Sequence, residues 1–211
     1  MYSRLVKYGN LPVSAATLAL EFPDIRKSAQ KLGLLERNKD IIRLRRDLYV
    51  CSEKISGKVL SLELIANRLL NPSYVSMSTA LRYYGLIPES VYLIQSVTIK
   101  ESREYETPVG RFVFTHIKRD AFNIGINNIE GNGYSFLIAS PEKALCDLIA
   151  NTPSLQLRYR KDALLYLERD IRLDMDTFFR FNPDIFRQYI AVGGKKATSV
   201  NTILTLLTKN G

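Results

Sequence analysis

The pattern of apolar and polar positions along the chain changes its period twice. Apolar residues recur at helical spacing near the start, then at alternate positions through a middle stretch, and at helical spacing again toward the end. We therefore predict an α+β protein. Its expected segments are two helices and a hairpin within residues 1–55, helices over about 59–85, a sheet over about 91–139 and helices over about 140–209.

Local signals mark where the first helices begin and end. Ser14 is a suitable N-cap for a helix over Ala15–Phe22, and Pro23 ends that helix because a residue before proline disfavours the α region. Asp24 or Ser28 caps a second helix that runs to about Asn38. The buried stripe predicted for this second helix consists of Ile25, Ala29, Leu32 and Leu35.

A β-hairpin is predicted directly after the second helix. Ile41–Leu44 and Leu48–Val50 are β-prone runs, and Arg45-Arg46-Asp47 lies between them as the turn, where Asp47 tolerates a left-handed backbone. A helix, a turn, a second helix and a basic hairpin are the parts of a winged helix-turn-helix. The sequence therefore predicts an N-terminal winged helix-turn-helix.

Charge strengthens this interpretation. Between Arg26 and Arg46 the chain has eight cations and two anions, a net charge of +6 out of +9 for the 211 residues. A basic helix with an adjacent ribbon suits double-stranded DNA, although a solvated basic face or an acidic protein partner would also fit. Ser28 and Gln30 are the candidates for base contacts. The candidates for phosphate contacts are Arg26, Lys27, Lys31, Lys39, Arg43, Arg45 and Arg46.

The rest of the chain is predicted to form a separate domain over residues 56–211, after a linker in Glu53–Lys58. Its sheet is expected to be mostly antiparallel. Ser140 and Pro141 begin a helix whose buried stripe is predicted to consist of Ala144, Leu145, Leu148 and Ile149.

Composition limits the function classes. No apolar run approaches 18 residues, so no membrane span is expected, and the apolar patch near Ala15 lacks a clear cleavage site. Cys51 and Cys146 form no disulfide framework, which is typical of reduced thiols in a cytoplasmic protein. His116 is the single histidine, so we expect no zinc site and no histidine-dependent triad. We expect no cofactor, no metal and no enzyme activity.

Three segments resemble one known family. Ile41–Val50, Tyr74–Tyr92 and Ser135–Ile149 are similar, in this order, to the wing and to two motifs of bacterial AbiEi-like antitoxins. The resemblance covers about residues 24–150. The wing turn of that family often has glycine where this chain has Asp47, and the helical tail after about residue 155 has no family motif.

The resemblance implies a type IV toxin–antitoxin system. Such antitoxins carry an N-terminal winged helix and a C-terminal antitoxin domain, and they repress their own operon. The cognate toxin resembles nucleotidyltransferases and is opposed without a stable complex. Lys143 and Asp147, expected to be exposed, would then either contribute to an antitoxicity surface or simply pair at their i, i+4 spacing.

Two other functions remain open. The chain could be a winged-helix transcriptional regulator unrelated to any toxin, with a ligand-sensing C-terminal domain. It could also be a phosphoryl- or nucleotidyl-transfer enzyme, although it has no phosphate-binding glycine loop followed by lysine and serine or threonine.

Overall fold

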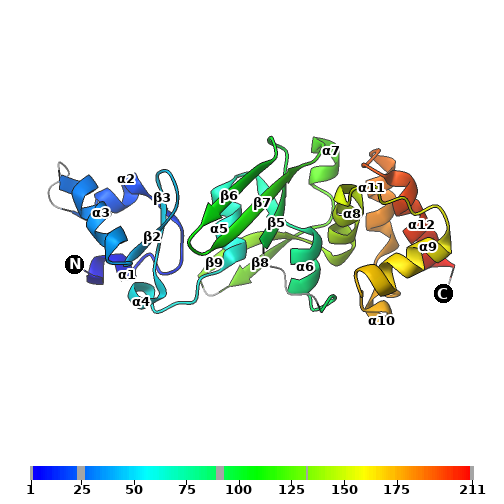
Figure 1. The fold of residues 1–211 in the computed structure, drawn as a ribbon, viewed down its shortest axis with the longest axis horizontal. Helices are drawn as coiled ribbons and strands as arrows, with labels where there is room; N and C mark the ends of the chain where they lie inside the picture. Colours follow the sequence, from blue (N-terminus) through cyan, green and yellow to red (C-terminus); the bar gives the residue numbers. More distant parts are fainter. Residues whose placement is uncertain (1, 23–26, 89–92, 132, 210–211) are drawn as a thin grey trace.

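The computed structural model describes residues 2–22, 27–88, 93–131 and 133–209. It is a mixed α+β protein whose elements follow one another along its longest axis (Figure 1). The N-terminal helices lie at one end, a six-stranded sheet lies in the middle, and the C-terminal helices lie at the other end. Within the described ranges, no helix is long and apolar enough to cross a membrane.

The N-terminal elements form a small layer of helices on a three-stranded antiparallel sheet of order β1-β3-β2. They are α1 (Tyr2–Val6), β1 (Val13–Ser14), α2 (Ala15–Ala19), α3 (Ser28–Arg37), β2 (Ile41–Arg45), β3 (Leu48–Cys51) and α4 (Glu53–Ser56). The Ser14 hydroxyl accepts a hydrogen bond from the Thr17 backbone N–H at 3.0 Å, which confirms the predicted cap of α2. The predicted hairpin is also confirmed, and Asp47 has the expected left-handed backbone, with φ of 62°.

The linker predicted over Glu53–Lys58 is wrong for its first four residues. Glu53–Ser56 form α4, and the side chain of Ile55 is buried with α1 and α3 because it faces their apolar cluster. Gly57, with φ of 64°, then ends the helical turn.

The larger sheet has the order β6-β7-β5-β4-β9-β8. Its strands are β4 (Ser73–Val75), β5 (Leu93–Thr98), β6 (Arg103–Thr107), β7 (Gly110–His116), β8 (Ile126–Gly131) and β9 (Tyr134–Ala139). The prediction of a mostly antiparallel sheet needs correction, because β5 pairs parallel with β7 and β4 pairs parallel with β9. Strand β4 has only three residues, too few to show a period, so its central place was not predicted.

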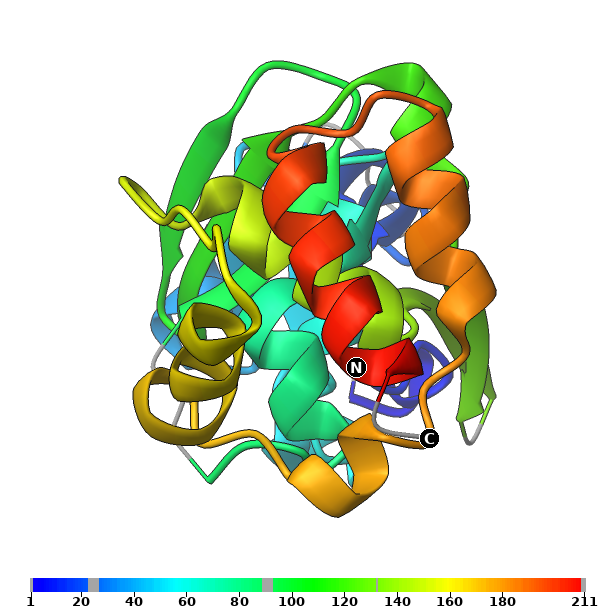
Figure 2. The ribbon, with the colours of Figure 1, turned by 90° about the vertical axis from the view of Figure 1, so that its right-hand side faces the viewer.

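Helices cover this sheet and extend the molecule at its far end. They are α5 (Leu62–Leu69), α6 (Met77–Tyr83), α7 (Arg119–Phe122), α8 (Pro141–Asn151), α9 (Arg160–Leu165), the π-helical turn η2 (Tyr166–Asp170), α10 (Met175–Phe178), α11 (Pro183–Ala191) and α12 (Ala197–Thr208). Seen from that end, α11 and α12 lie side by side in front of α8 (Figure 2). Helix α8 is therefore enclosed between the sheet with α6 and the C-terminal helices.

Two buried apolar clusters meet at the β2–β3 hairpin. Tyr49 and Cys51 of β3 face the N-terminal cluster with Leu32 and Leu35, whereas Leu48 and Val50 face the cluster of the larger sheet. This two-residue alternation buries both faces of the hairpin. The arginine-bearing tip and the side chain of Arg43 are left exposed to a partner.

Gly125 provides a test of how closely the start of α8 packs against the segment before β8. Its φ is +58°, and an added Cβ would lie 2.9 Å from Cβ of Lys143 and 3.1 Å from Oγ of Ser140. We expect Gly125→Ala to lower the free energy of unfolding by about 2–4 kcal/mol, because overpacking adds to the backbone strain. Denaturant unfolding measures the loss.

The matched control is Gly57→Ala. Gly57 has a similar φ of +64° but nothing within 4 Å of its added Cβ, so it should cost only about 1–2 kcal/mol of backbone strain. Equal losses in the two variants would contradict the close seating of α8.

Candidate functional site

Helix α3 presents a basic stripe to solvent. Lys27, Gln30, Leu34 and Arg37 are exposed and Lys31 is half-buried, at spacings of three and four that place them on one face. The Nζ of Lys31 lies 5.5 Å from the centre of the Phe22 ring, within the range of a cation–π contact. The same five side chains, with Gly33, line an open hollow along the helix. A partner whose groove receives this helix would meet cations and one amide there.

The opposite stripe of α3 differs from the prediction. Leu32 and Leu35 are buried as expected, but Ala29 is exposed and Ser28 is half-buried in its place. Ser28, Leu32 and Leu35 are spaced by four and three residues, so Ser28 belongs to the inward face. Gln30 is therefore the better placed of the two candidates for base contacts. Ile25 and Arg26, and with them the Asp24 cap, lie outside the described residues.

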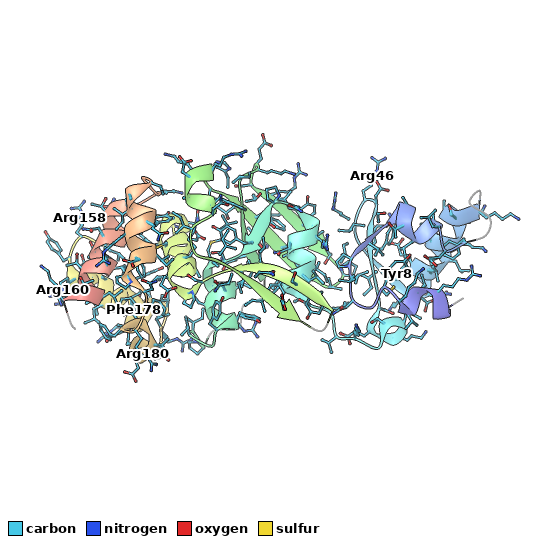
Figure 3. All side chains as sticks on the ribbon, turned by 180° about the vertical axis from the view of Figure 1, so that it is seen from behind. Tyr8, Arg46, Arg158, Arg160, Phe178 and Arg180 are labelled. Atoms are coloured by element: carbon cyan, nitrogen blue, oxygen red, sulfur yellow. The ribbon has the colours of Figure 1, made fainter. Side chains whose placement is uncertain are left out.

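The hairpin tip carries the most accessible charges. The side chain of Arg46 is 96% exposed, and its Nε lies 3.7 Å from the carboxylate of Asp47, which is itself 77% exposed. Figure 3 shows Arg46 extending away from the ribbon. Arg45 and Lys39 are exposed as well. An ion pair this exposed contributes little, so Arg46 remains available to a phosphate.

Arg43 is more engaged than the sequence indicates. Its guanidinium lies 2.9 Å from the Glu36 carboxylate and 5.4 Å from the centre of the Tyr49 ring. The other anion of the segment, Asp40, is buried, with Lys54 Nζ 3.7 Å from its carboxylate. Arg43 would have to leave Glu36 to bind a phosphate, which makes it a weaker candidate than Arg45 or Arg46.

A basic cleft next to the hairpin was not predicted. Arg45 lines it together with Arg68 from the end of α5, Lys100 after β5 and Arg103 at the start of β6. Glu101 is the single carboxylate in its lining, and Tyr105 adds an aromatic ring. These cations are far apart in the sequence, so no spacing signal could have identified them. They extend the positive surface from the hairpin onto the larger sheet.

The expected exposure of Lys143 and Asp147 is wrong. Both side chains are 0% exposed and form an ion pair on consecutive turns of α8. Polar residues opposite the apolar stripe of a helix predict a solvent-facing side, but α11 and α12 cover that side of α8. These two residues therefore form no antitoxicity surface, and the alternative interpretation, that they pair, is confirmed.

Asp147 is the centre of a buried hydrogen-bond network. Its carboxylate accepts hydrogen bonds from the hydroxyls of Tyr74 at 3.0 Å and Ser76 at 2.7 Å, in addition to the Lys143 ammonium. Burial raises the pKa of Tyr74 well above its ordinary value, and the neighbouring carboxylate raises it further. Tyr74 therefore keeps its proton and remains a donor.

Lys143 is enclosed by aromatic rings. Its Nζ lies 5.3 Å from the ring centres of both Tyr74 and Tyr189, so β4 and α11 cover it from two sides. The Tyr189 hydroxyl donates to the carbonyl of Lys195 at 3.1 Å, and burial raises its pKa. The C-terminal tail thus takes part in burying the ion pair.

These contacts explain two of the segments on which the family resemblance depends. Tyr74 and Ser76 come from the second segment, and Lys143 and Asp147 come from the third. They meet because β4 leads directly into α6 and α6 packs against α8. The polar residues of both segments stabilise the fold, so their pattern does not identify a contact site.

No group of three or more His, Cys, Asp or Glu side chains that could bind a metal ion occurs in the part of the chain that the structure describes. Cys51 and Cys146 are free and buried. Burial raises the pKa of the Cys51 thiol to about 11, which leaves it protonated and unreactive at neutral pH.

The ion pair can be tested by removing one partner. We expect Lys143→Met and Asp147→Asn each to lower the free energy of unfolding by about 3–5 kcal/mol, because each leaves a buried charge without its counter-ion. The double variant should lose less than the sum, because neither charge then remains buried. Denaturant unfolding of the four proteins measures the coupling.

An exposed pair on a helix of the same region is the matched control. Arg187 and Asp184 are 2.6 Å apart with side chains 54% and 64% exposed. Arg187→Ala should change stability by no more than about 1 kcal/mol. A loss in Asp147→Asn as small as in Arg187→Ala would contradict the burial of Lys143.

Comparison with known proteins adds no family to this geometry. No protein-family model matches the chain, and no curated protein matches it either. The resemblance to AbiEi-like antitoxins therefore depends on the three segments alone. What the chain itself presents is a basic stripe, a basic hairpin tip and a basic cleft at the N-terminal end of a mixed α+β protein.

Proposed function

We propose that this protein is a DNA-binding antitoxin that represses its own operon and that its N-terminal elements form a winged helix-turn-helix. The observation that carries the proposal is the exposed basic stripe of α3 beside an arginine-tipped hairpin. Cations in these two places match the phosphates on either side of a groove, and Gln30 supplies an amide suited to a base edge.

The order of the N-terminal elements supports the winged-helix assignment. A helix, a short strand and two further helices precede an antiparallel hairpin, and the short strand β1 pairs with β3 of that hairpin. Helix α3 directly precedes the hairpin, as a recognition helix precedes a wing. The predicted turn between α2 and α3 includes residues 23–26, which lie outside the described part of the chain.

The basic cleft lengthens the positive surface along which a bound duplex could lie. Arg68, Lys100 and Arg103 lie beside Arg45, and no ion pair joins Arg68 or Lys100 to a carboxylate among the described residues. A duplex seated on α3 and the hairpin tip would place flanking phosphates at this cleft. Contacts of this kind contribute affinity without sequence preference.

The antitoxin part of the proposal depends on the resemblance of residues 24–150. The resemblance implies a toxin that resembles nucleotidyltransferases and whose action this protein opposes without forming a stable complex. The second candidate is a regulator unrelated to any toxin. The burial of Lys143 and Asp147 favours this alternative, because it removes the two residues proposed for antitoxicity.

Salt dependence tests the DNA interface. With about five phosphate contacts, log K for the DNA upstream of the gene should fall with log salt at a slope of about −4 to −5. We expect Arg45→Ala/Arg46→Ala to weaken binding to all sequences and to flatten the slope by about 2, because two contacts are lost. Gel-shift titrations at several salt concentrations, against a scrambled duplex, give both values.

The control also removes two positive charges, but at the opposite end of the molecule. Arg158 and Arg180 lie far from Arg46 (Figure 3), so Arg158→Ala/Arg180→Ala should leave the slope unchanged. An equal loss in both double variants would indicate attraction by net charge alone. Equal weak binding of the wild type to upstream and scrambled DNA would overturn autoregulation.

Growth assays test the antitoxin function. If a nucleotidyltransferase-like gene lies next to this one, its expression should arrest growth and co-expression of this protein should restore it. Arg45→Ala/Arg46→Ala should still restore growth when both genes are expressed from unrelated promoters, because only repression requires the hairpin tip. Arrest that the wild-type protein does not relieve, or the lack of any such neighbour, would favour the regulator.

A further inference from the structure

A cavity of about 390 Å³ lies where the C-terminal tail meets the larger sheet, at a distance from the basic hairpin. It is bounded by the end of β7, by α7, by the last turn of α8 and by the loop after α11. Its size is within the range of small-molecule sites in proteins. The lining residues are His116, Ile117, Lys118, Ala121, Ala150, Asn151, Tyr189, Val192, Gly193, Gly194 and Lys195.

The inner wall of this cavity is apolar. Ala121 and Ala150 are buried, Ile117 is half-buried, and the side chain of Val192 remains 38% exposed. The Tyr189 ring closes one side, packed against the backbone of Gly194, where an added Cβ would lie 2.3 Å from the ring. An apolar body entering here would be removed from water on several sides.

The charged groups of the lining are two lysines. Lys118 and Lys195 are exposed, no carboxylate occurs in the lining, and neither lysine forms an ion pair with a described residue. His116 Nδ1 lies 3.0 Å from the carbonyl oxygen of Lys100. Because a carbonyl only accepts, Nδ1 carries the proton, and Nε2 is left for other contacts.

Helix ends decide how a ligand would be oriented. Asn151 ends α8 and Val192 follows α11, so both helices direct their C-terminal ends toward the cavity. Those ends carry partial negative charge and disfavour an anion deep inside. A ligand with one charged end would therefore place its anionic group at the mouth, by the two lysines, and its apolar body inside.

We propose that this cavity binds a small organic anion that has an apolar body and a single carboxylate, sulfonate or phosphate group. The lysines act as point charges and need no particular arrangement of acceptor oxygens, so any one of these three anionic groups suits them. The proposal does not depend on DNA binding, which rests on α3, the hairpin tip and the basic cleft.

Binding would also affect the tail. The Tyr189 ring that closes the cavity is one of the two rings over Lys143, and Asn151 donates to the backbone carbonyl of Asp147 at 2.8 Å. A ligand packed against that ring holds α11 against α8. Because it binds the folded chain only, it should raise the melting temperature, and above its Kd the rise should follow the logarithm of its concentration.

The test uses the full chain and the fluorescent anion 8-anilinonaphthalene-1-sulfonate, with octanoate as a non-fluorescent competitor. We expect saturable binding at one site per chain, displacement by octanoate, and a higher melting temperature with octanoate. Lys118→Glu/Lys195→Glu should weaken octanoate binding by roughly tenfold or more, because the headgroup then meets like charges. Val192→Trp should abolish binding by filling the cavity from its exposed side.

The matched control is Lys161→Glu/Lys209→Glu, which reverses two exposed charges outside the cavity and should bind like the wild type. Circular dichroism and unfolding curves confirm that each variant is folded. Dye binding that octanoate does not displace, more than one equivalent site, or equal octanoate affinity in a folded Val192→Trp variant would overturn the proposal.

Discussion

The buried ion pair between Lys143 and Asp147 is the constraint on which the larger part of the molecule depends. A buried charge is tolerated only when it is paired and hydrogen-bonded, and here the partners come from several elements. β4 supplies Tyr74, the start of α6 supplies Ser76, and α11 supplies the ring of Tyr189. Each of these elements must be in place before the charges can leave water. The pair therefore specifies how sheet, central helix and tail fit together.

The hairpin β2–β3 joins this body to the N-terminal helices. One of its faces belongs to each apolar cluster, so the hairpin is held on both sides while its tip projects. A rigid hairpin base gives the exposed arginines a defined position relative to α3 and to the cleft with Arg68 and Lys100. Preorganised cations lose less conformational entropy when they bind a phosphate backbone. The alternation of side chains along β3 thus produces both the apolar packing and the fixed position of the proposed interface.

The two proposed sites make different physical demands, and they meet at one point, where the carbonyl of Lys100 in the basic cleft lies 3.0 Å from His116 of the cavity. The basic surface is open and polar, as an interface with a hydrated polyanion requires. The cavity beneath the tail is apolar inside and cationic only at its mouth, as a small amphipathic ligand requires. Because α8 and its ion pair lie between the larger sheet and the tail, occupation of the cavity acts first on the packing of α11. Neither site requires the other.

The sequence by itself determined the local elements, because their causes are local. Ser14 and Ser140 start helices through side-chain caps, Asp47 forms a turn because it tolerates a left-handed backbone, and alternation predicts the hairpin. Tertiary structure decided what covers each element. It placed the three-residue strand β4 in mid-sheet, exposed Ala29, buried Lys143 and Asp147 beneath the tail, and gathered Arg45, Arg68, Lys100 and Arg103 around one cleft. Burial and long-range proximity depend on partners far away in the sequence, and no local pattern records them.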